Sequence, residues 1–155
     1  MKVYLDVCCL NRPFDDQRQD RIHLESESVL LILRHIASHK WEWVSSEVVD
    51  FEILQTPEME RRARTWLIAQ RADHKILVDQ AVVQRGREVE AMGFGPYDSL
   101  HVACAERGKV NVFLTTDDRI LALARRHSAR LEVRVSNPLL WLREVIENES
   151  GEHDS

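Results

Sequence analysis

Short apolar runs alternate with longer helical patterns along this chain, and this alternation constrains the fold more than any other feature. The runs that are typical of strands are Val3–Leu5, Trp41–Val44, Ile76–Val78, Val112–Leu114 and Leu131–Val135. Helical patterns cover about residues 20–39, 46–55, 58–71, 80–92, 96–108, 117–128 and 138–148. Because strands joined by helices need crossover connections, the sequence predicts an α/β fold with a mostly parallel sheet of about five strands, covered on both faces.

The length of 155 residues suits one domain of ordinary size. We therefore expect a single domain over residues 1–148 and a polar, disordered tail over residues 149–155. No apolar run approaches the roughly 18 residues of a membrane span, and the N-terminus lacks a signal-peptide pattern, so we expect a cytoplasmic protein with no membrane partner. The three cysteines form no CxxC pair, which favours reduced thiols over disulfides or a thiolate zinc site.

Asp6 directly follows the first apolar run, in MKVYLDVCCLNRP, where a lone buried carboxylate would cost several kcal/mol unless it is paired or bound to a cation. In open parallel sheets, ligands bind at the carboxyl ends of the strands, beside the point where the strand order reverses. The run Val112–Leu114 ends in the same way, in LTTDDRI, with Asp117. If these two strands are neighbours, their terminal aspartates lie close together.

Two more acids reach the same region by helical geometry. In SSEVVDFEILQT, Glu52 falls on the apolar stripe of its helix, whereas Glu47 and Asp50 fall on the other side. In FGPYDSLHVACAERG, Gly95 and Pro96 mark a helix start, which places Asp98 in the first turn.

Each acid also has a structural explanation. Asp98 could complement the helix dipole, and Asp117 could be an N-cap. Glu52 could pair with an arginine, and Asp6 could accept hydrogen bonds from backbone amides.

Four acids at one sheet edge repel one another and need a counter-ion. Mg²⁺ prefers oxygen ligands and bridges to phosphate oxygens, and Mn²⁺ accepts the same ligands. Such a site favours phosphodiester hydrolysis, and the sequence contains no P-loop, GxSxG or HExxH motif.

A net charge of −5 argues against a broad electrostatic attraction to nucleic acid. Two arginine clusters leave local phosphate contacts open, although solvated helix faces explain them equally well: Arg61, Arg62, Arg64 and Arg71, and Arg125, Arg126, Arg130 and Arg134.

The segments VYLDV, SSEVVDFEIL, YDSLHVACA and FLTTDDRIL, taken in this order over residues 2–125, resemble the PIN domain family, which includes the VapC-type toxins of toxin–antitoxin pairs. The resemblance implies a three-layer α/β/α fold with strand order 3-2-1-4-5. It also implies an Mg²⁺- or Mn²⁺-dependent ribonuclease, often dimeric, that a small antitoxin protein holds inactive. On this reading the catalytic residues are Asp6, Glu52, Asp98 and Asp117, of which Asp6, Asp98 and Asp117 bind the metal ion.

The chain departs from the family at Cys8, where many members carry a polar residue. Asn11 or a water molecule is expected to fill that role, and the Thr116 hydroxyl is expected to orient water or phosphate. Glu25 lies on the inward stripe of its helix and is a further candidate ligand, with an ion pair to Arg21 or Arg18 as the alternative explanation.

Asp117 and Asp118 are adjacent at a helix start and project about 100° apart, so only one of them can face Asp6. We assign Asp117 to the metal ion, because it comes directly off the strand end. Asp118 is expected to act as a first-turn charge paired with Arg119 or Arg125.

Two other functions remain open at this point: a PIN-like module that binds RNA or protein without cleaving, and a small-molecule phosphatase, which lacks a nucleophile motif here. Two apolar stripes are expected either to pack on the core or to form dimer or antitoxin surfaces. They are Met59, Ala63, Trp66 and Leu67 in one helix, and Leu139, Leu142 and Ile146 in the last helix.

Overall fold

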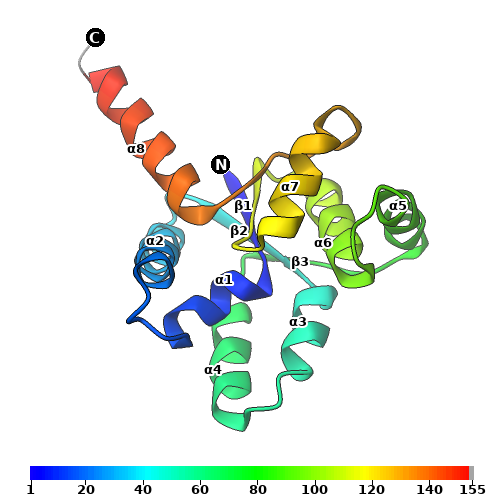
Figure 1. The fold of residues 1–155 in the computed structure, drawn as a ribbon, viewed down its shortest axis with the longest axis horizontal. Coiled ribbons are helices and arrows are strands. Elements are labelled where there is room, and N and C mark those ends of the chain that lie inside the picture. The colour runs from blue at the N-terminus through cyan, green and yellow to red at the C-terminus, as the bar shows by residue number, and fades with distance from the viewer. Residues whose placement is uncertain (154–155) are drawn as a thin grey trace.

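The computed structural model describes residues 1–153 and contains one five-stranded parallel sheet in the order β3-β2-β1-β4-β5 (Figure 1). The strands are β1 (Lys2–Leu5), β2 (Glu42–Ser46), β3 (His74–Ile76), β4 (Val112–Leu114) and β5 (Val135–Ser136). Both the parallel sheet and the predicted order 3-2-1-4-5 are confirmed. All four strand pairs are parallel, as crossover helices between successive strands require.

Helices cover both faces of the sheet in a three-layer α/β/α arrangement, with α2 and α8 on one side and α5 and α6 on the other (Figure 1). The α-helices are α1 (Val7–Asn11), α2 (Asp20–Ala37), α3 (Glu47–Leu54), α4 (Met59–Ala69), α5 (Gln80–Glu90), α6 (Pro96–Arg107), α7 (Asp118–Arg126) and α8 (Pro138–His153). Two short 3₁₀ helices are η1 (Arg12–Phe14) and η2 (Ser128–Arg130). In the part of the chain that the structure describes, no helix is long and apolar enough to cross a membrane.

The strand order reverses between β1 and β4, and these two strands run side by side to their carboxyl ends. Leu5 is in register with Leu114, and the Asp6 amide continues the ladder by donating to the Leu114 carbonyl at 3.0 Å. The residues that follow the two strands therefore emerge next to each other. Since β2 and β3 are on the opposite side of β1 from β4 and β5, this edge of the sheet forms the crevice in which such folds bind ligands.

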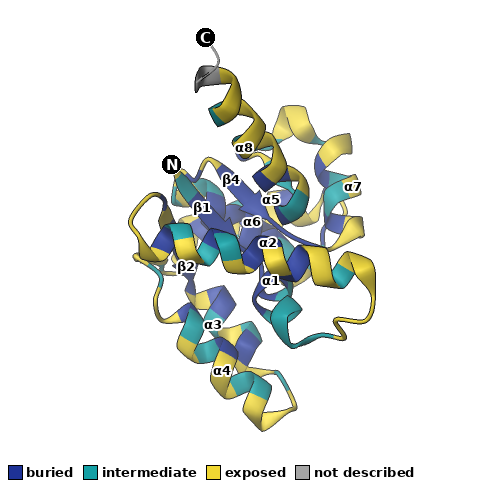
Figure 2. Cartoon of the chain, turned by 90° about the vertical axis from the view of Figure 1, so that its left-hand side faces the viewer, coloured by how far each residue is buried: buried dark blue, intermediate teal, exposed yellow. Residues whose placement is uncertain are grey.

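The core is the sheet itself and the inner faces of its helices, which Figure 2 shows as buried. Tyr4 of β1 is fully buried and packs edge-to-face on Phe113 of β4, with ring centroids 5.3 Å apart. Strands buried on both faces are expected to be continuous apolar runs, and β4 is one such run. The two strands that carry the crevice are thus buried in the core along almost their whole length.

Several element boundaries differ from those predicted. Strand β3 begins two residues before the predicted run, and β5 lies at the end of its predicted run, because each edge strand is placed by its register with a buried neighbour rather than by its own apolar residues. The short helix α1, directly after β1, was not predicted.

Helix α8 continues through His153, so residues 149–153 are helical rather than a disordered tail, and residues 154 and 155 lie outside the described residues. Lys40 pairs with Glu149 at 3.0 Å, which contributes to holding this extension. The single domain over residues 1–148 stays a prediction.

Candidate functional site

A cavity of about 320 Å³ opens where β1 and β4 end. Nine residues line it, and they include all four predicted acids and the predicted supporting residue Asn11. The lining residues are Asp6, Val7, Cys8, Asn11, Glu52, Gln55, Thr56, Asp98 and Asp117. The structure therefore brings together acids that are up to 111 positions apart in the sequence, from the ends of two strands and from helices α3 and α6.

Asp6 is only 5% exposed and is held by three neighbours. It is the N-cap of α1, and its Oδ1 accepts from the Val7 amide at 2.8 Å. The Thr115 hydroxyl donates to its Oδ2 at 2.8 Å, and the Cys8 thiol lies 3.3 Å from the same oxygen. The chain can turn into a helix directly after a strand here because the aspartate side chain caps the first free amide. These bonds offset part of the cost of burying the carboxylate.

Asp117 is the N-cap of α7, and its Oδ1 accepts from the amides of Arg119 at 2.9 Å and Ile120 at 3.3 Å. The hydroxyl of Thr115 accepts from the Asp117 amide at 3.1 Å while it donates to Asp6. Thr115 thus connects the two strand-end aspartates. Thr116, which was predicted to orient water, is buried and does not line the cavity. The sequence does carry a signal for Thr115. It directly follows the apolar run Val112–Leu114, as Asp6 directly follows Val3–Leu5, so the two residues come opposite each other when these strands pair.

His101 of α6 is fully buried beside the acids and was missed in the sequence. Its Nε2 lies 3.3 Å from Glu52 Oε2 and 3.8 Å from Asp6 Oδ1. One ligand atom from each of these three residues lies within 4.8 Å of the other two. The available indication was spacing: His101 comes three residues after Asp98, so both lie on one face of α6. Because His101 stands inside the apolar stretch LHVACA, hydrophobic patterning alone does not distinguish it from a core residue.

The carboxyl groups of this cluster are strained electrostatically. Burial first, and then the nearby charges of Asp6 and Asp117, together raise the pKa of Asp98 to about 6, while His101 opposes them. Burial, opposed by His101 and assisted by Glu52, also raises the pKa of Asp6. For His101, burial disfavours the cation, but the hydrogen bond to Glu52 and the charge of Asp6 outweigh it and raise the pKa. The fold therefore holds more negative charge here than its own groups neutralise.

The residues present fit a hard divalent cation. Their donors are carboxylate oxygens that repel one another, and Asn11 adds a buried Oδ1 that has no hydrogen-bond partner among the described residues. Oxygen donors of this kind are the ligands that Mg²⁺ and Mn²⁺ prefer. The Cys8 thiol is a poor ligand for Mg²⁺, but it already contacts Asp6 and leaves the cation to the oxygens.

Asp118 points away from this cavity. It makes a two-bond ion pair with Arg21 of α2, with both N–O distances 2.8 Å, and does not pair with the predicted Arg119 or Arg125. That prediction was wrong because helical spacing indicates partners only within the same helix, whereas Arg21 is 97 positions away in the sequence. Of the two neighbours, Asp117 lines the cavity and Asp118 does not, while the assignment of Asp117 to a metal ion stays a prediction.

Glu25, the further candidate ligand, is a structural acid. It is buried and pairs with Arg12 at 2.9 Å and with Arg21 at 3.3 Å, and it accepts from the Asn137 side chain at 2.6 Å. The ion pair with Arg21 agrees with the alternative explanation. Arg18 instead pairs with Asp16.

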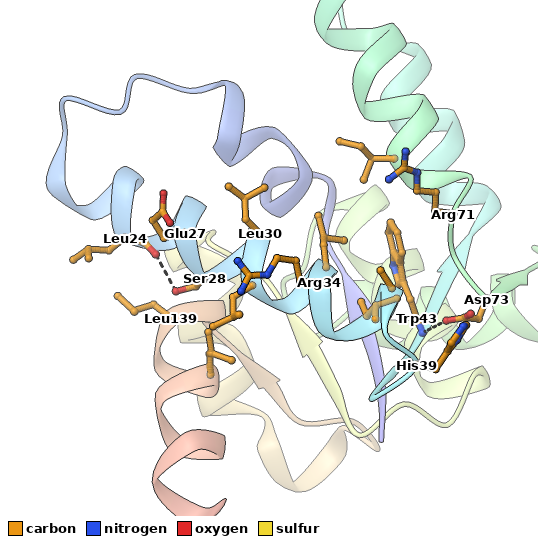
Figure 3. A pocket seen from close by; sticks show the side chains of 16 residues that line it. Leu24, Glu27, Ser28, Leu30, Arg34, His39, Trp43, Arg71, Asp73 and Leu139 are labelled. Carbon is orange, nitrogen blue, oxygen red and sulfur yellow. Dashed lines mark hydrogen bonds between the residues drawn. The ribbon is translucent and has the colours of Figure 1, made fainter. Parts of the chain in front are cut away.

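A second, much larger cavity of about 980 Å³ lies between α2, α4 and α8 (Figure 3). Its floor is apolar, and two guanidinium groups, those of Arg34 and Arg71, line it without an ion-pair partner among the described residues. We call it the α2 groove. Its apolar lining includes Leu24, Leu30, Leu31, Ile36, Ile68, Leu139 and Leu142.

The parallel sheet with this strand order and the acids at its switch point define a PIN-like α/β protein. The sequence model of the PIN domain matches residues 3–126, and the chain belongs to this family. A comparison with curated protein sequences found no match. Among solved structures, the chain is similar to one described as VapBC2 from Rickettsia felis bound to a DNA fragment from their promoter. The TM-score is 0.56 at 14% identity, and the likeness covers 87% of this chain and 98% of the other, so it shows a shared fold.

Proposed function

We propose that this chain is an endoribonuclease that hydrolyses RNA phosphodiester bonds with Mg²⁺ or Mn²⁺, and that it is the toxin of a type II toxin–antitoxin pair. The observation that carries the proposal is the convergence of Asp6, Glu52, Asp98 and Asp117 on one cavity at the switch point. Membership of the PIN family and the likeness to a VapBC structure support it.

Asp6, Asp98 and Asp117 would hold the cation, which supplies charge neutralisation at the phosphate and lowers the pKa of a bound water. Thr115 keeps the first of these carboxylates in place. Glu52 has a half-buried side chain whose Oε2 contacts His101, while its Oε1 makes no hydrogen bond among the described residues. Glu52 Oε1 would accept a hydrogen bond from the attacking water and orient it toward the phosphorus.

Cleavage assays test this directly. The purified protein is incubated with structured and unstructured RNAs in Mg²⁺ or Mn²⁺, with and without a chelator. We expect metal-dependent cleavage that Glu52→Gln removes and Glu47→Gln retains, because Glu47 lies on the same helix outside the cavity. No cleavage in either metal ion would contradict the proposal and favour a PIN-like module that binds RNA or protein without cleaving it.

The α2 groove is the surface on which we place the antitoxin. An apolar cavity of this size on a monomer usually binds a partner. The lining carries Arg34 and Arg71 together with Glu27 and Asp73, so it would fit a segment with apolar side chains on one face and an acidic side chain opposite each arginine. The structure described as VapBC2 is similar in fold, and we extend the idea of a protein partner from it to this chain.

Co-expression with the product of the adjacent open reading frame tests the partner. We expect a complex on size exclusion that Arg34→Glu disrupts, whereas Arg143→Glu, on the exposed side of α8, leaves it intact. Equal loss in both variants, or no complex with wild type, would contradict this placement.

A homodimer remains a proposal too. Of the two predicted stripes, Met59 and Leu67 are largely exposed, as is Ile146, whereas Leu142 is buried on the core. The exposed members would form the dimer surface, and light scattering that shows a strict monomer at high concentration would contradict it.

A further inference from the structure

A continuous chain of buried hydrogen bonds runs from the start of α3 to the acid cavity. The Tyr4 hydroxyl lies 2.6 Å from Ser46 Oγ and 2.7 Å from His101 Nδ1. On the other side of the ring, His101 Nε2 lies 3.3 Å from Glu52 Oε2. Ser46, Tyr4 and His101 are all buried, and only Glu52 reaches the solvent. This series of hydrogen bonds begins and ends on the same helix, because Ser46 is the N-cap of α3 and Glu52 lies in its second turn.

Counting donors and acceptors shows in which direction each hydrogen bond of this series is donated. Ser46 Oγ accepts from the Val49 amide at 3.2 Å, so its own hydrogen is available for the Tyr4 oxygen. Tyr4 then donates to His101 Nδ1, and the remaining hydrogen of a neutral imidazole must be on Nε2, facing Glu52. If the ring is protonated, Nδ1 donates to Tyr4 and Nε2 keeps its hydrogen. The opposite neutral tautomer would aim a lone pair at two carboxylates, which is unfavourable.

We propose that His101 is a positioning residue that fixes the Glu52 carboxylate beside Asp6, and that Tyr4 and Ser46 hold the imidazole for this task. The inference rests on the proposed nuclease function for its consequence in catalysis, but the hydrogen-bond chain itself does not.

Glu52 needs such a support. Its side chain has three rotatable bonds, is partly exposed, and is repelled by the carboxylates of Asp6 and Asp98. Without a donor it would gain rotamer entropy and hydration by turning outward. A buried N–H from a closely surrounded ring opposes this, in the way that hydrogen-bond partners behind metal ligands hold carboxylates and imidazoles in place. The packing of the His101 ring near Tyr4 and Phe113 restricts its rotation.

The test compares four variants. Tyr4→Phe removes the hydroxyl and keeps the buried ring, and Tyr97→Phe makes the same change at an exposed tyrosine next to Asp98 whose hydroxyl makes no hydrogen bond among the described residues. His101→Gln places an amide donor near the position of Nε2, and His101→Leu supplies none. We expect Tyr4→Phe and His101→Leu to lower kcat about 10- to 100-fold at an unchanged KM for RNA. His101→Gln should recover part of the loss, and Tyr97→Phe should match wild type.

Two further measurements do not depend on cleavage. Nitrogen-15 NMR of labelled histidine should show a hydrogen on His101 Nε2 in wild type both without metal and with Mg²⁺ bound, and a mixture of tautomers in Tyr4→Phe at alkaline pH. Thermal unfolding in chelator verifies that each variant is folded before kcat is compared.

Two results would overturn the inference. If Tyr4→Phe and Tyr97→Phe have the same kcat and the same histidine spectrum, the chain does not position Glu52. If Nε2 loses its hydrogen when Mg²⁺ is added, His101 is a metal ligand instead. A wild-type protein that cleaves no RNA would refute the proposed function, while the NMR result would still decide the role of His101.

Discussion

Replacing Asp98 with asparagine should make the metal-free protein more stable at neutral pH while it abolishes metal-dependent stabilisation. Asp98 lies in the first turn of α6 and has its pKa raised from 3.8 to about 6, chiefly by burial and by the charges of Asp6 and Asp117. Its ionised form is therefore unfavourable in the folded state. The cost is absent below pH 4, grows as the carboxyl ionises, and is complete above about pH 6.

The size of the effect follows from the shift. A difference of about 2 pKa units corresponds to about 3 kcal/mol, and solvent screening of this partly exposed group reduces it to about 1.5 kcal/mol. The asparagine also loses the favourable helix-dipole interaction of a first-turn acid, about 0.5 kcal/mol. The net gain is about 1 kcal/mol, or about 2–4 °C in Tm for a chain of this length.

Urea unfolding in chelator between pH 4 and 8 measures this gain. The free energy of unfolding of Asp98→Asn should increasingly exceed that of wild type as pH rises from 4 to 6, and the difference should persist at higher pH. Asp20→Asn, at the exposed first turn of α2, is the matched control and should show no gain. Adding Mn²⁺ should stabilise wild type and the control but not Asp98→Asn. An Asp98→Asn protein that is less stable than wild type at pH 7.5 in chelator would refute the electrostatic reasoning.

Three more outcomes follow from the contacts. Asp117→Asn should abolish cleavage while Asp118→Asn retains most of it, because only Asp117 lines the cavity. RNA cleavage assays of both variants measure this, and an inactive Asp118→Asn beside an active Asp117→Asn would show that the site is misassigned by one residue. Thr115→Val should cost about 1–3 kcal/mol of unfolding free energy by leaving a buried carboxylate with one donor fewer, whereas Thr116→Val should cost less in the same urea titration. Glu25→Gln should destabilise by about 1–3 kcal/mol, because Arg12 and Arg21 each lose a charged hydrogen-bond partner but keep their pairs with Asp15 and Asp118; calorimetry that finds Tm unchanged would contradict this.

The parts of the fold that could be predicted are those that local patterns encode. Alternating apolar runs and helical stripes predict parallel strands and crossovers, and an acid directly after an apolar run predicts its place at the carboxyl end of a strand. The meeting of Asp6 with Asp117 needed one further assumption, that their strands are neighbours, and the register of Leu5 with Leu114 supplies it. The strand order itself came from the family resemblance, because nothing in the spacing of runs decides which strands pair.

What could not be predicted depends on contacts between distant segments. Asp118 pairs with Arg21, and Glu25 with Arg12, across gaps that no periodicity describes. His101 was not singled out in the sequence, since a buried histidine and a core residue have the same spacing. The contact on which its proposed role rests, between the Tyr4 hydroxyl and His101 Nδ1, joins two distant elements.

Asp6 shows why a fold would keep an unfavourable group at its centre. Its carboxylate accepts from the Val7 amide and from Thr115, yet burial and the charge of Glu52 still raise its pKa. Hydrogen bonding has therefore fixed the geometry of the carboxylate without removing its electrostatic cost. A cation that binds the folded state alone recovers that cost as affinity, and stabilises the protein by about 1.4 kcal/mol for each tenfold rise in concentration above Kd. If the proposed function is correct, neutralising Asp98 should stabilise the free protein and weaken its cation site, so stability and activity would be opposed at this edge of the sheet.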